Sequence, residues 1–244
     1  MIIYDEMKSP TLLKLWWEKM SQDVANSYPI VDFSLIDNKF KMNTCVDIGC
    51  NVGAFSLVAS ERFKSVVSFE PGYFTSIIAR TKLNQQEGKK NIVVYNLAVG
   101  KNTGDIVKLR CDTNDGERNS GNATTTYDTD SEEYELITTV SLEKVFELCE
   151  TDFIDYLKID CEGAEYDILL DKDLSNIGII CGEIHGHPIL GFDVARKKLL
   201  NYMSANFNIS ASRHNFFAVN KKYNIDPTKF YYGDLYEAQP LQNR

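Results

Sequence analysis

The sequence has no long apolar run and no clustered cysteines. No window approaches the roughly 18 apolar residues of a membrane span, and the start, MIIYDEMKSPTLLKLWW, lacks the basic and apolar regions of a signal peptide. The 6 cysteines are scattered without a C-x-x-C pair, which disfavours a zinc site and favours reduced thiols. We therefore expect a cytoplasmic protein without a membrane span.

Basic residues are also in short supply. The chain has 26 Lys and Arg against 35 Asp and Glu, which gives a net charge of -9 and a pI near 4.9. An acidic surface repels the phosphate backbone of a nucleic acid unless a local basic patch exists. The basic residues are scattered, and the run RKK at 196–198 is short. We therefore expect no nucleic-acid partner.

The rest of the composition is typical of a globular protein, and strand and helix patterns alternate along it. Short apolar runs indicate strands in TCVDIG, SVVSFEP, NIVVYNLAVG, DYLKIDC and IGIICGEI. Helical spacing follows most of these runs, and a strand pair, NISASR and NFFAVNK, closes the pattern. This alternation predicts an α/β fold whose mostly parallel sheet is covered by helices on both faces. The closing hairpin would add an antiparallel strand.

Two segments stand apart from this alternation. Residues 10–26 predict an amphipathic helix, so we expect residues 1–40 to form a helical extension packed on a single domain spanning 41–244. Residues 111–135 are polar, acidic and almost free of aliphatic side chains. A stretch this long inside a compact domain is either a functional lid or a disordered insertion, and both remain open.

The loop after the first strand predicts a ligand site. Gly49 and Gly53 flank a tight turn into a helix, whose N-terminal N–H groups attract an anion. The spacing Gly49-x-Asn51-x-Gly53 does not match the G-x-G-x-x-G dinucleotide fingerprint. Asp47, just before the loop, would repel a pyrophosphate but would suit an ammonium group. S-adenosylmethionine, with its ammonium, carboxylate and sulfonium, fits this pattern.

Residues at the ends of the second and third strands extend this site. Glu70 ends the second strand, where its carboxylate can accept hydrogen bonds from both hydroxyls of a ribose. The same role occurs in nicotinamide sites, so Glu70 by itself does not discriminate between cofactors. Asn96 and Ala98 follow the third strand and are expected on the adenine side. A polar turn leaving the sheet is the alternative for these two residues.

At this point the sequence resembles a known family. The segments VDIGCNVGAFSL, SFEP, YNLAVG, LKIDCEGAEYDIL and GEIHG, in this order, are similar to the FkbM-type methyltransferases over roughly residues 44–187. The resemblance implies a class I, Rossmann-like methyltransferase fold with a seven-stranded sheet and an antiparallel last strand. It also implies O-methylation, often of a sugar or natural-product hydroxyl. The first 40 residues, the polar insertion and the tail KFYYGDLYEAQP lie outside it.

Acids after the fourth strand are the candidates for chemistry. Methyl transfer to an alcohol needs a group that accepts the hydroxyl proton, and Asp160 and Glu162 follow the strand that should lie beside the first. His185, after the fifth strand, is the second candidate for the base, because imidazole titrates near neutrality. A histidine hydrogen-bonded in a turn is the alternative for this residue. Glu165 fits a helix start, where acids interact well with the dipole. Glu183 could join Asp160 and Glu162 around Mg²⁺, but no ligand spacing requires a metal, and we predict none.

Two rival functions remain open from the sequence. One is a nicotinamide-dependent oxidoreductase on the same fold, against which the missing third glycine and Asp47 argue. The other is a module that binds the cofactor without catalysis. In the leading interpretation the partner is a carbohydrate or small-molecule acceptor. The aromatic tail could form a homodimer contact or cover the cleft.

Overall fold

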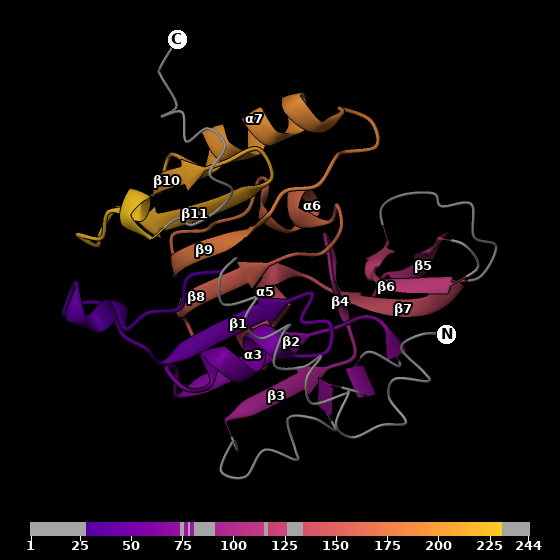
Figure 1. Cartoon of the computed structure of the whole chain (residues 1–244), viewed down its shortest axis with the longest axis horizontal. Helices are drawn as coiled ribbons and strands as arrows, with labels where there is room; N and C mark the ends of the chain where they lie inside the picture. Colours follow the sequence, from indigo (N-terminus) through magenta and orange to yellow (C-terminus); the bar gives the residue numbers. More distant parts are fainter. Residues whose placement is uncertain are drawn as a thin grey trace.

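The main sheet has seven strands. The chain adds them first on one side of β1 and then on the other, so the strand order reverses once. The computed structural model describes residues 28–73, 76–77, 79–80, 91–114, 117–125 and 134–230. The sheet order is β10-β11-β9-β8-β1-β2-β3 (Figure 1). The strands are β1 (Thr44–Ile48), β2 (Ser65–Phe69), β3 (Ile92–Tyr95), β8 (Ile154–Ile159), β9 (Ile177–Glu183), β10 (Phe207–Ala211) and β11 (Asn215–Asn220).

Strand directions confirm the predicted fold class. β1, β2, β3, β8 and β9 pair in parallel, whereas β11 runs antiparallel to both β9 and β10. This is the class I methyltransferase arrangement with an antiparallel last strand. The chain leaves β1 toward β3 and returns on the other side of β1 as β8. Ligands of open parallel sheets bind where the strand order reverses in this way, beyond the carboxyl ends of the strands.

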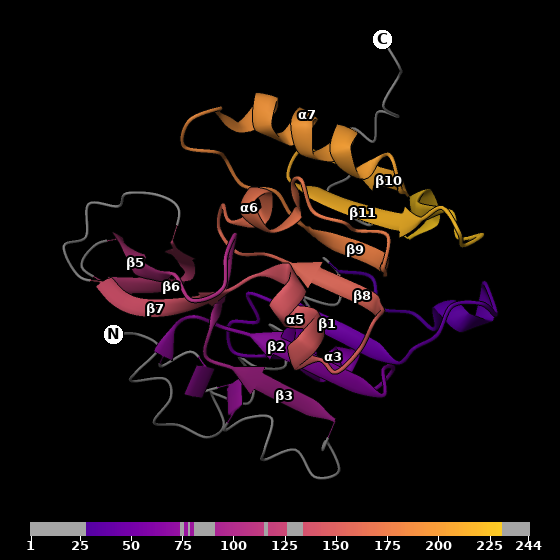
Figure 2. The ribbon, with the colours of Figure 1, turned by 180° about the vertical axis from the view of Figure 1, so that it is seen from behind.

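Helices cover both faces of this sheet, as the alternating pattern predicted. β1 and β8 are buried along their whole lengths, which explains their almost uninterrupted apolar character. α3 (Ala54–Ala59) lies on one face, and α5 (Leu142–Leu148), α6 (Glu165–Leu169) and α7 (Phe192–Met203) lie on the other (Figures 1 and 2). The α3 face packs an aromatic cluster that includes Phe33, Phe40 and Tyr156. Among the described residues, no helix has the length and apolar character needed to cross a membrane.

A second sheet contains most of what the structure describes of the polar insertion. Its order is β4-β7-β5-β6, with β4 (Ala98–Val99), β5 (Ile106–Asn114), β6 (Glu117–Thr124) and β7 (Tyr134–Val140). The described backbone of 111–124 therefore pairs as strands, which corrects the option of a disordered insertion for that part. Figure 1 shows this sheet to one side of the main sheet. Its role as a lid remains a prediction.

Some predictions fall on residues that the structure does not describe. The helix expected over 10–26 lies outside the described residues, as does most of the tail KFYYGDLYEAQP. The described part of the predicted extension packs on the core, because Tyr28, Phe33 and Phe40 are buried in the α3-side cluster. η1 (Phe33–Leu35) lies in this stretch, and η2 (Pro227–Lys229) lies near the end of the described chain.

Candidate functional site

A cavity opens at the carboxyl ends of β1, β2 and β8, where the strand order reverses. Its empty volume is about 620 Å³, and part of this space is open to solvent. Leu109 and Thr125 border it from the second sheet. The predicted site residues among its lining are Gly49, Asn51, Glu70, Ala98, Asp160 and Glu162. Residues of four of the five sequence motifs therefore line one cavity, whereas Gly53 and His185 are not among its lining residues.

Gly49 allows the end of β8 to approach the first loop closely. Its φ is +75°, and a Cβ placed there would lie 1.8 Å from the carbonyl oxygen of Asp160. The Asp160 N–H in turn donates to the Ile48 carbonyl at 3.1 Å. A side chain at position 49 would push the ends of β1 and β8 apart. Glycine at this position therefore lets the two strand ends that border the cavity lie close together.

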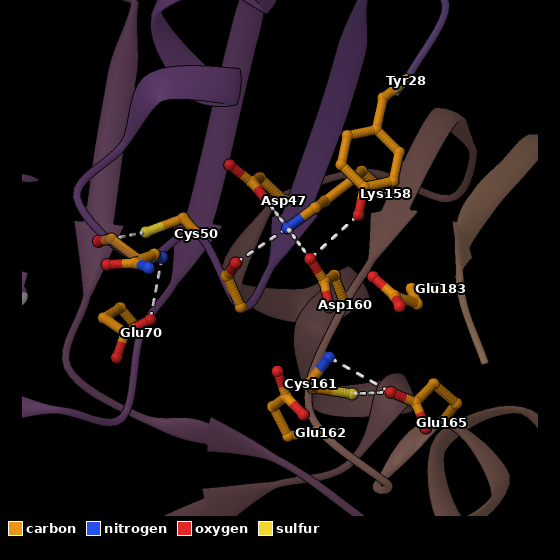
Figure 3. Close-up of polar contacts among 12 residues, drawn as sticks. Tyr28, Asp47, Cys50, Glu70, Lys158, Asp160, Cys161, Glu162, Glu165 and Glu183 are labelled. Atoms are coloured by element: carbon orange, nitrogen blue, oxygen red, sulfur yellow. Dashed lines mark hydrogen bonds and ion pairs between the residues drawn. The ribbon is translucent and has the colours of Figure 1, made fainter. Parts of the chain in front are cut away.

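Asp47 does not line the cavity. Its side chain is fully buried and accepts a 2.6 Å hydrogen bond from the Ser56 hydroxyl. The ammonium of Lys158 lies 3.3 Å from its other oxygen and donates to the Gly49 carbonyl at 2.8 Å (Figure 3). Asp47 and Lys158 therefore form a buried ion pair beneath the loop, and the contact of Asp47 with a ligand ammonium stays a prediction. The sequence pattern does not reveal this ion pair, because Lys158 reaches Asp47 from the neighbouring strand.

The ion pair holds Lys158 charged although it is almost completely buried. Desolvation would lower the pKa of its ammonium, but the nearby charges of Asp47 and Asp160 raise that pKa instead. Lys158 lies 3.9 Å from Asp160. Lys158 thus lies between Asp47, beneath the first loop, and Asp160, a candidate for the general base.

Glu70 and Asn51 form a polar corner of the cavity. The Glu70 carboxylate accepts hydrogen bonds from the backbone N–H groups of Asn51 at 2.9 Å and Gly72 at 2.8 Å. Burial raises the pKa of Glu70 to about 7, against the lowering effect of these two donors. The amide oxygen of Asn51 is buried and has no hydrogen-bond partner within the described residues. A ligand carrying hydroxyl or ammonium donors would satisfy the buried amide oxygen of Asn51 beside the Glu70 carboxylate.

Asn96 supports this corner without lining the cavity. Its side-chain amide donates to the carbonyls of Glu70 at 3.0 Å and Pro71 at 2.7 Å. The structure thus favours the alternative of a polar turn for Asn96, whose amide fixes the chain after β2. Ala98 does line the cavity, as predicted for the adenine side, although its role there is untested.

Asp160 has a partner that the sequence did not suggest. The hydroxyl of Tyr28 donates to Asp160 Oδ2 at 2.9 Å (Figure 3). Burial and the adjacent Asp160 raise the pKa of Tyr28 well above its usual value, so the phenol remains a donor. The two residues lie 132 positions apart in sequence. Residues 27–29 carry no motif that would have identified Tyr28.

His185 joins two of the acids. Its Nδ1 lies 2.8 Å from Glu165 Oε1, and its Nε2 lies 3.2 Å from Glu162 Oε2. Burial would lower the pKa of the imidazole, but the hydrogen bond and charge of Glu165, with Glu162, raise it to about 9. The ring is therefore protonated at neutral pH when only these residues surround it. That protonation argues against the predicted role of His185 as the base.

Glu165 does more than complement the dipole of α6. Its carboxylate is fully buried and accepts hydrogen bonds from the backbone N–H groups of Gly163 and Cys161. Together with the contact to His185, these bonds fix the turn that carries Glu162. Glu162 itself has a φ of +52°, a conformation that non-glycine residues adopt mainly at constrained sites.

Glu162 and Glu183 are held close to other negative charges. Burial raises the pKa of Glu162 to about 7, although the charge of His185 opposes this shift. Burial and the neighbouring Asp160 also raise the pKa of Glu183. Among the described residues, the ends of β8 and β9 therefore hold more carboxylates than cationic side chains.

Comparison with known proteins identifies the family. A family model described as the Methyltransferase FkbM domain matches residues 47–213, more than half of the chain. No curated protein matches the sequence.

Several solved structures are similar in part. A methyltransferase FkbM from Methylobacillus flagellatus KT is 14% identical over 75% of this chain, with a TM-score of 0.47. The match spans 45% of that protein's length. A methyltransferase from Geobacter sulfurreducens is 12% identical over 84% of this chain and 89% of its own, with a TM-score of 0.45. M. capricolum TrmK, solved with S-adenosyl-homocysteine, is 13% identical over 81% of this chain and 72% of its own, with a TM-score of 0.41.

The family match covers the first loop, Glu70 and the acids after β8, and it removes the nicotinamide-dependent oxidoreductase from consideration. The chain belongs to the FkbM family of methyltransferases, and its cofactor is S-adenosylmethionine.

Proposed function

We propose that this chain is an O-methyltransferase that acts on a hydroxyl group of a sugar, a glycan or another natural product. The observation that carries the proposal is the position of Asp160 and Glu162 on the same cavity as Glu70 and Asn51. A neutral alcohol must lose its proton as it attacks, so a carboxylate beside the acceptor is needed. A neutral amine could lose its proton afterwards and would not need such a base.

The cofactor side follows from the polar corner of the cavity. Glu70 retains a free lone pair on each oxygen for a ribose hydroxyl, and Asn51 offers an unused amide oxygen to an N–H or O–H donor. Gly49 and Gly53 bring backbone close to the ligand, while Ala98 provides a small surface for the base. Asp47 and Asn96 act indirectly, because they hold Lys158 and the chain after β2.

The acceptor side positions the hydroxyl and takes its proton. When bound, S-adenosylmethionine supplies an electrophilic methyl group, and its sulfur leaves with the electron pair of the broken carbon–sulfur bond. Asp160 or Glu162 accepts the proton of the hydroxyl as its oxygen forms the new bond to carbon. Tyr28 and Lys158 hold the Asp160 carboxylate from the side away from Glu162 (Figure 3), which supports orientation of the hydroxyl toward the cofactor.

The second sheet borders the acceptor side and supports a role in substrate selection. Thr124 donates from its hydroxyl to the Glu162 carbonyl at 2.7 Å, and Glu135 accepts a hydrogen bond from the Tyr73 N–H at 3.0 Å. We propose that the described part of this insertion, residues 111–114, 117–125 and 134–135, closes over the acceptor. Shortening this segment should then weaken acceptor use more than thermal stability.

The experiment measures cofactor binding and methyl transfer separately. Calorimetric titration with S-adenosylhomocysteine should show one site per chain, and Glu70→Ala should weaken it strongly. Methyl-labelled cofactor with a panel of sugars and phenols should then give labelled methyl ether. Binding without transfer to any acceptor would favour the non-catalytic module, whereas absence of binding to folded protein would contradict the proposal itself.

A further inference from the structure

Three potential metal ligands meet at the ends of β8 and β9. Asp160, Glu183 and His185 each offer a donor atom, and these atoms all lie within 4.8 Å of one another. β8 and β9 pair in parallel, with Ile159 opposite Gly182, so the spacing is set by neighbouring backbone. All three side chains are half-buried. Two carboxylates favour a hard divalent ion such as Mg²⁺ or Mn²⁺, and one imidazole is compatible with Mn²⁺.

The orientation of His185 is fixed from behind by a residue outside this group. Glu165, fully buried at the start of α6, holds Nδ1 at 2.8 Å. Nε2 therefore faces Glu162 at 3.2 Å and Glu183 at 3.9 Å. A carboxylate that anchors the far nitrogen of an imidazole is the arrangement commonly found behind metal-bound histidines, because it fixes the ring and strengthens the ligand.

The charges at this edge favour an added cation. Asp160, Glu162, Glu165 and Glu183 gather around a single imidazole, and Lys158 lies closer to Asp47, at 3.3 Å, than to Asp160, at 3.9 Å. Figure 3 shows Glu183 beside Asp160. Partly desolvated carboxylates at this spacing repel one another. A divalent ion brings two positive charges where a protonated imidazole brings one.

We propose that Asp160, Glu183 and His185 bind a divalent cation, Mn²⁺ or Mg²⁺, on the acceptor side of the cavity. Its role in the reaction rests on the proposed function: the ion binds oxygens of the acceptor and lowers the pKa of the attacking hydroxyl. Asp160 also lines the cavity, so the ion borders the space that the acceptor must occupy. Glu162 is then the carboxylate left to accept the proton. Adjacent hydroxyls, as in a sugar, suit such an ion best.

The test uses metal-free full-length protein titrated with Mn²⁺ and followed by electron paramagnetic resonance of the free ion. We expect about one Mn²⁺ per chain, displaced by excess Mg²⁺. Glu183→Gln should weaken binding about tenfold or more, since even changes behind the ligands weaken metal sites by that factor. Its affinity for S-adenosylhomocysteine should stay the same, because Glu183 is not among the residues that line the cofactor cavity.

Glu162→Gln is the matched control, because it removes the same charge from the same edge without removing one of the three ligands. It should weaken Mn²⁺ binding only a few-fold. Equal losses in both variants, or no binding by the wild type at millimolar Mn²⁺, would overturn the site. Thermal melting checks each variant, and His185→Gln tests the site through another ligand if Glu183→Gln is unfolded. Because S-adenosylhomocysteine is titrated separately, a failed metal site leaves the proposed methyltransferase activity intact.

Discussion

The two sides of the cavity are built in different ways. On the cofactor side, the first loop and Glu70 lie close in sequence, and backbone N–H groups satisfy the carboxylate. On the acceptor side, Asp160 depends on Tyr28, 132 residues away, and the Glu162 carbonyl accepts from Thr124, 38 residues away. The Glu70–Asn51 corner therefore depends on a contact between residues 19 apart in sequence, whereas Asp160 and Glu162 depend on contacts between more distant segments. This contrast suggests that cofactor binding and acceptor chemistry can be disturbed independently.

We expect the largest effect at Gly49, where the cofactor side and the acceptor side of the cavity meet. Gly49→Ala places a Cβ 1.8 Å from the Asp160 carbonyl at a positive φ, so we expect a loss of at least about 3 kcal/mol in unfolding free energy. Cofactor binding and any transferase activity should disappear together. Urea unfolding and S-adenosylhomocysteine titration measure both effects.

Gly104→Ala is the control for that substitution. Gly104 also has a positive φ, +91°, but apart from its chain neighbours no heavy atom of the described residues lies within 4 Å of the position that a Cβ would occupy there. The expected loss is about 1 kcal/mol, from backbone strain alone. Similar losses in the two variants would show that the approach of the loop to β8 contributes little.

Asp160→Asn should separate the two sides. Turnover should fall by about 10²-fold, because the carboxylate would no longer be available to hold an ion or accept a proton. Affinity for S-adenosylhomocysteine should change only a few-fold, since Glu70 and Asn51 remain. Steady-state kinetics with labelled cofactor give the first quantity and calorimetry the second. Asp193→Asn, exposed at the start of α7, should alter neither, and an active Asp160→Asn would contradict the assignment.

Local patterns were sufficient for the sheet and for the positions of the motifs. The alternating apolar runs predicted the strands of the main sheet, and the Gly49–Gly53 spacing placed the loop at the cavity. The predicted contact of Asp47 with a ligand ammonium stays a prediction. The sequence pattern does not specify the ion pair between Asp47 and Lys158 of β8. No local rule encodes such a partner, since it arises only when β1 and β8 become neighbours.

The polar insertion shows the same limit. Its lack of aliphatic side chains suggested a lid or a disordered loop, yet β5 and β6 pair there in an antiparallel ladder. A pair of antiparallel strands can satisfy its backbone hydrogen bonds without an apolar face. Amino-acid composition alone therefore underestimates how much regular structure this segment has. Likewise, the anchoring of His185 by Glu165 depends on α6 packing beside the end of β9, which the motif KIDCEGAE does not reveal.

The pH dependence of cofactor affinity tests the cofactor side of the cavity through the protonation of Glu70. The pKa of Glu70 is about 7 without ligand, and ribose hydroxyls that donate to its carboxylate would favour the ionised form. Binding then releases a proton below pH 7, so affinity rises with pH by up to about tenfold per unit and levels off above 7. Calorimetry from about pH 5.5 to about 8.5 measures this. Glu70→Gln should bind about tenfold more weakly with no such rise, and an unchanged slope would assign the proton to another group.

Removal of the Tyr28 hydroxyl is the mildest test. Tyr28→Phe keeps the ring against Phe55, at a centroid distance of 5.8 Å, but removes the donor to Asp160. One hydrogen bond of about 1 kcal/mol corresponds to about a fivefold fall in turnover, while cofactor affinity remains unchanged. Tyr156→Phe is the matched control, because its buried hydroxyl donates to the Pro29 carbonyl at 2.7 Å and not to an acid of the cavity. It should lower stability by about 1 kcal/mol without slowing turnover. Equal kinetic effects in the two variants would mean that Tyr28 acts only through packing, and the acceptor side would then not depend on its long-range hydrogen bond.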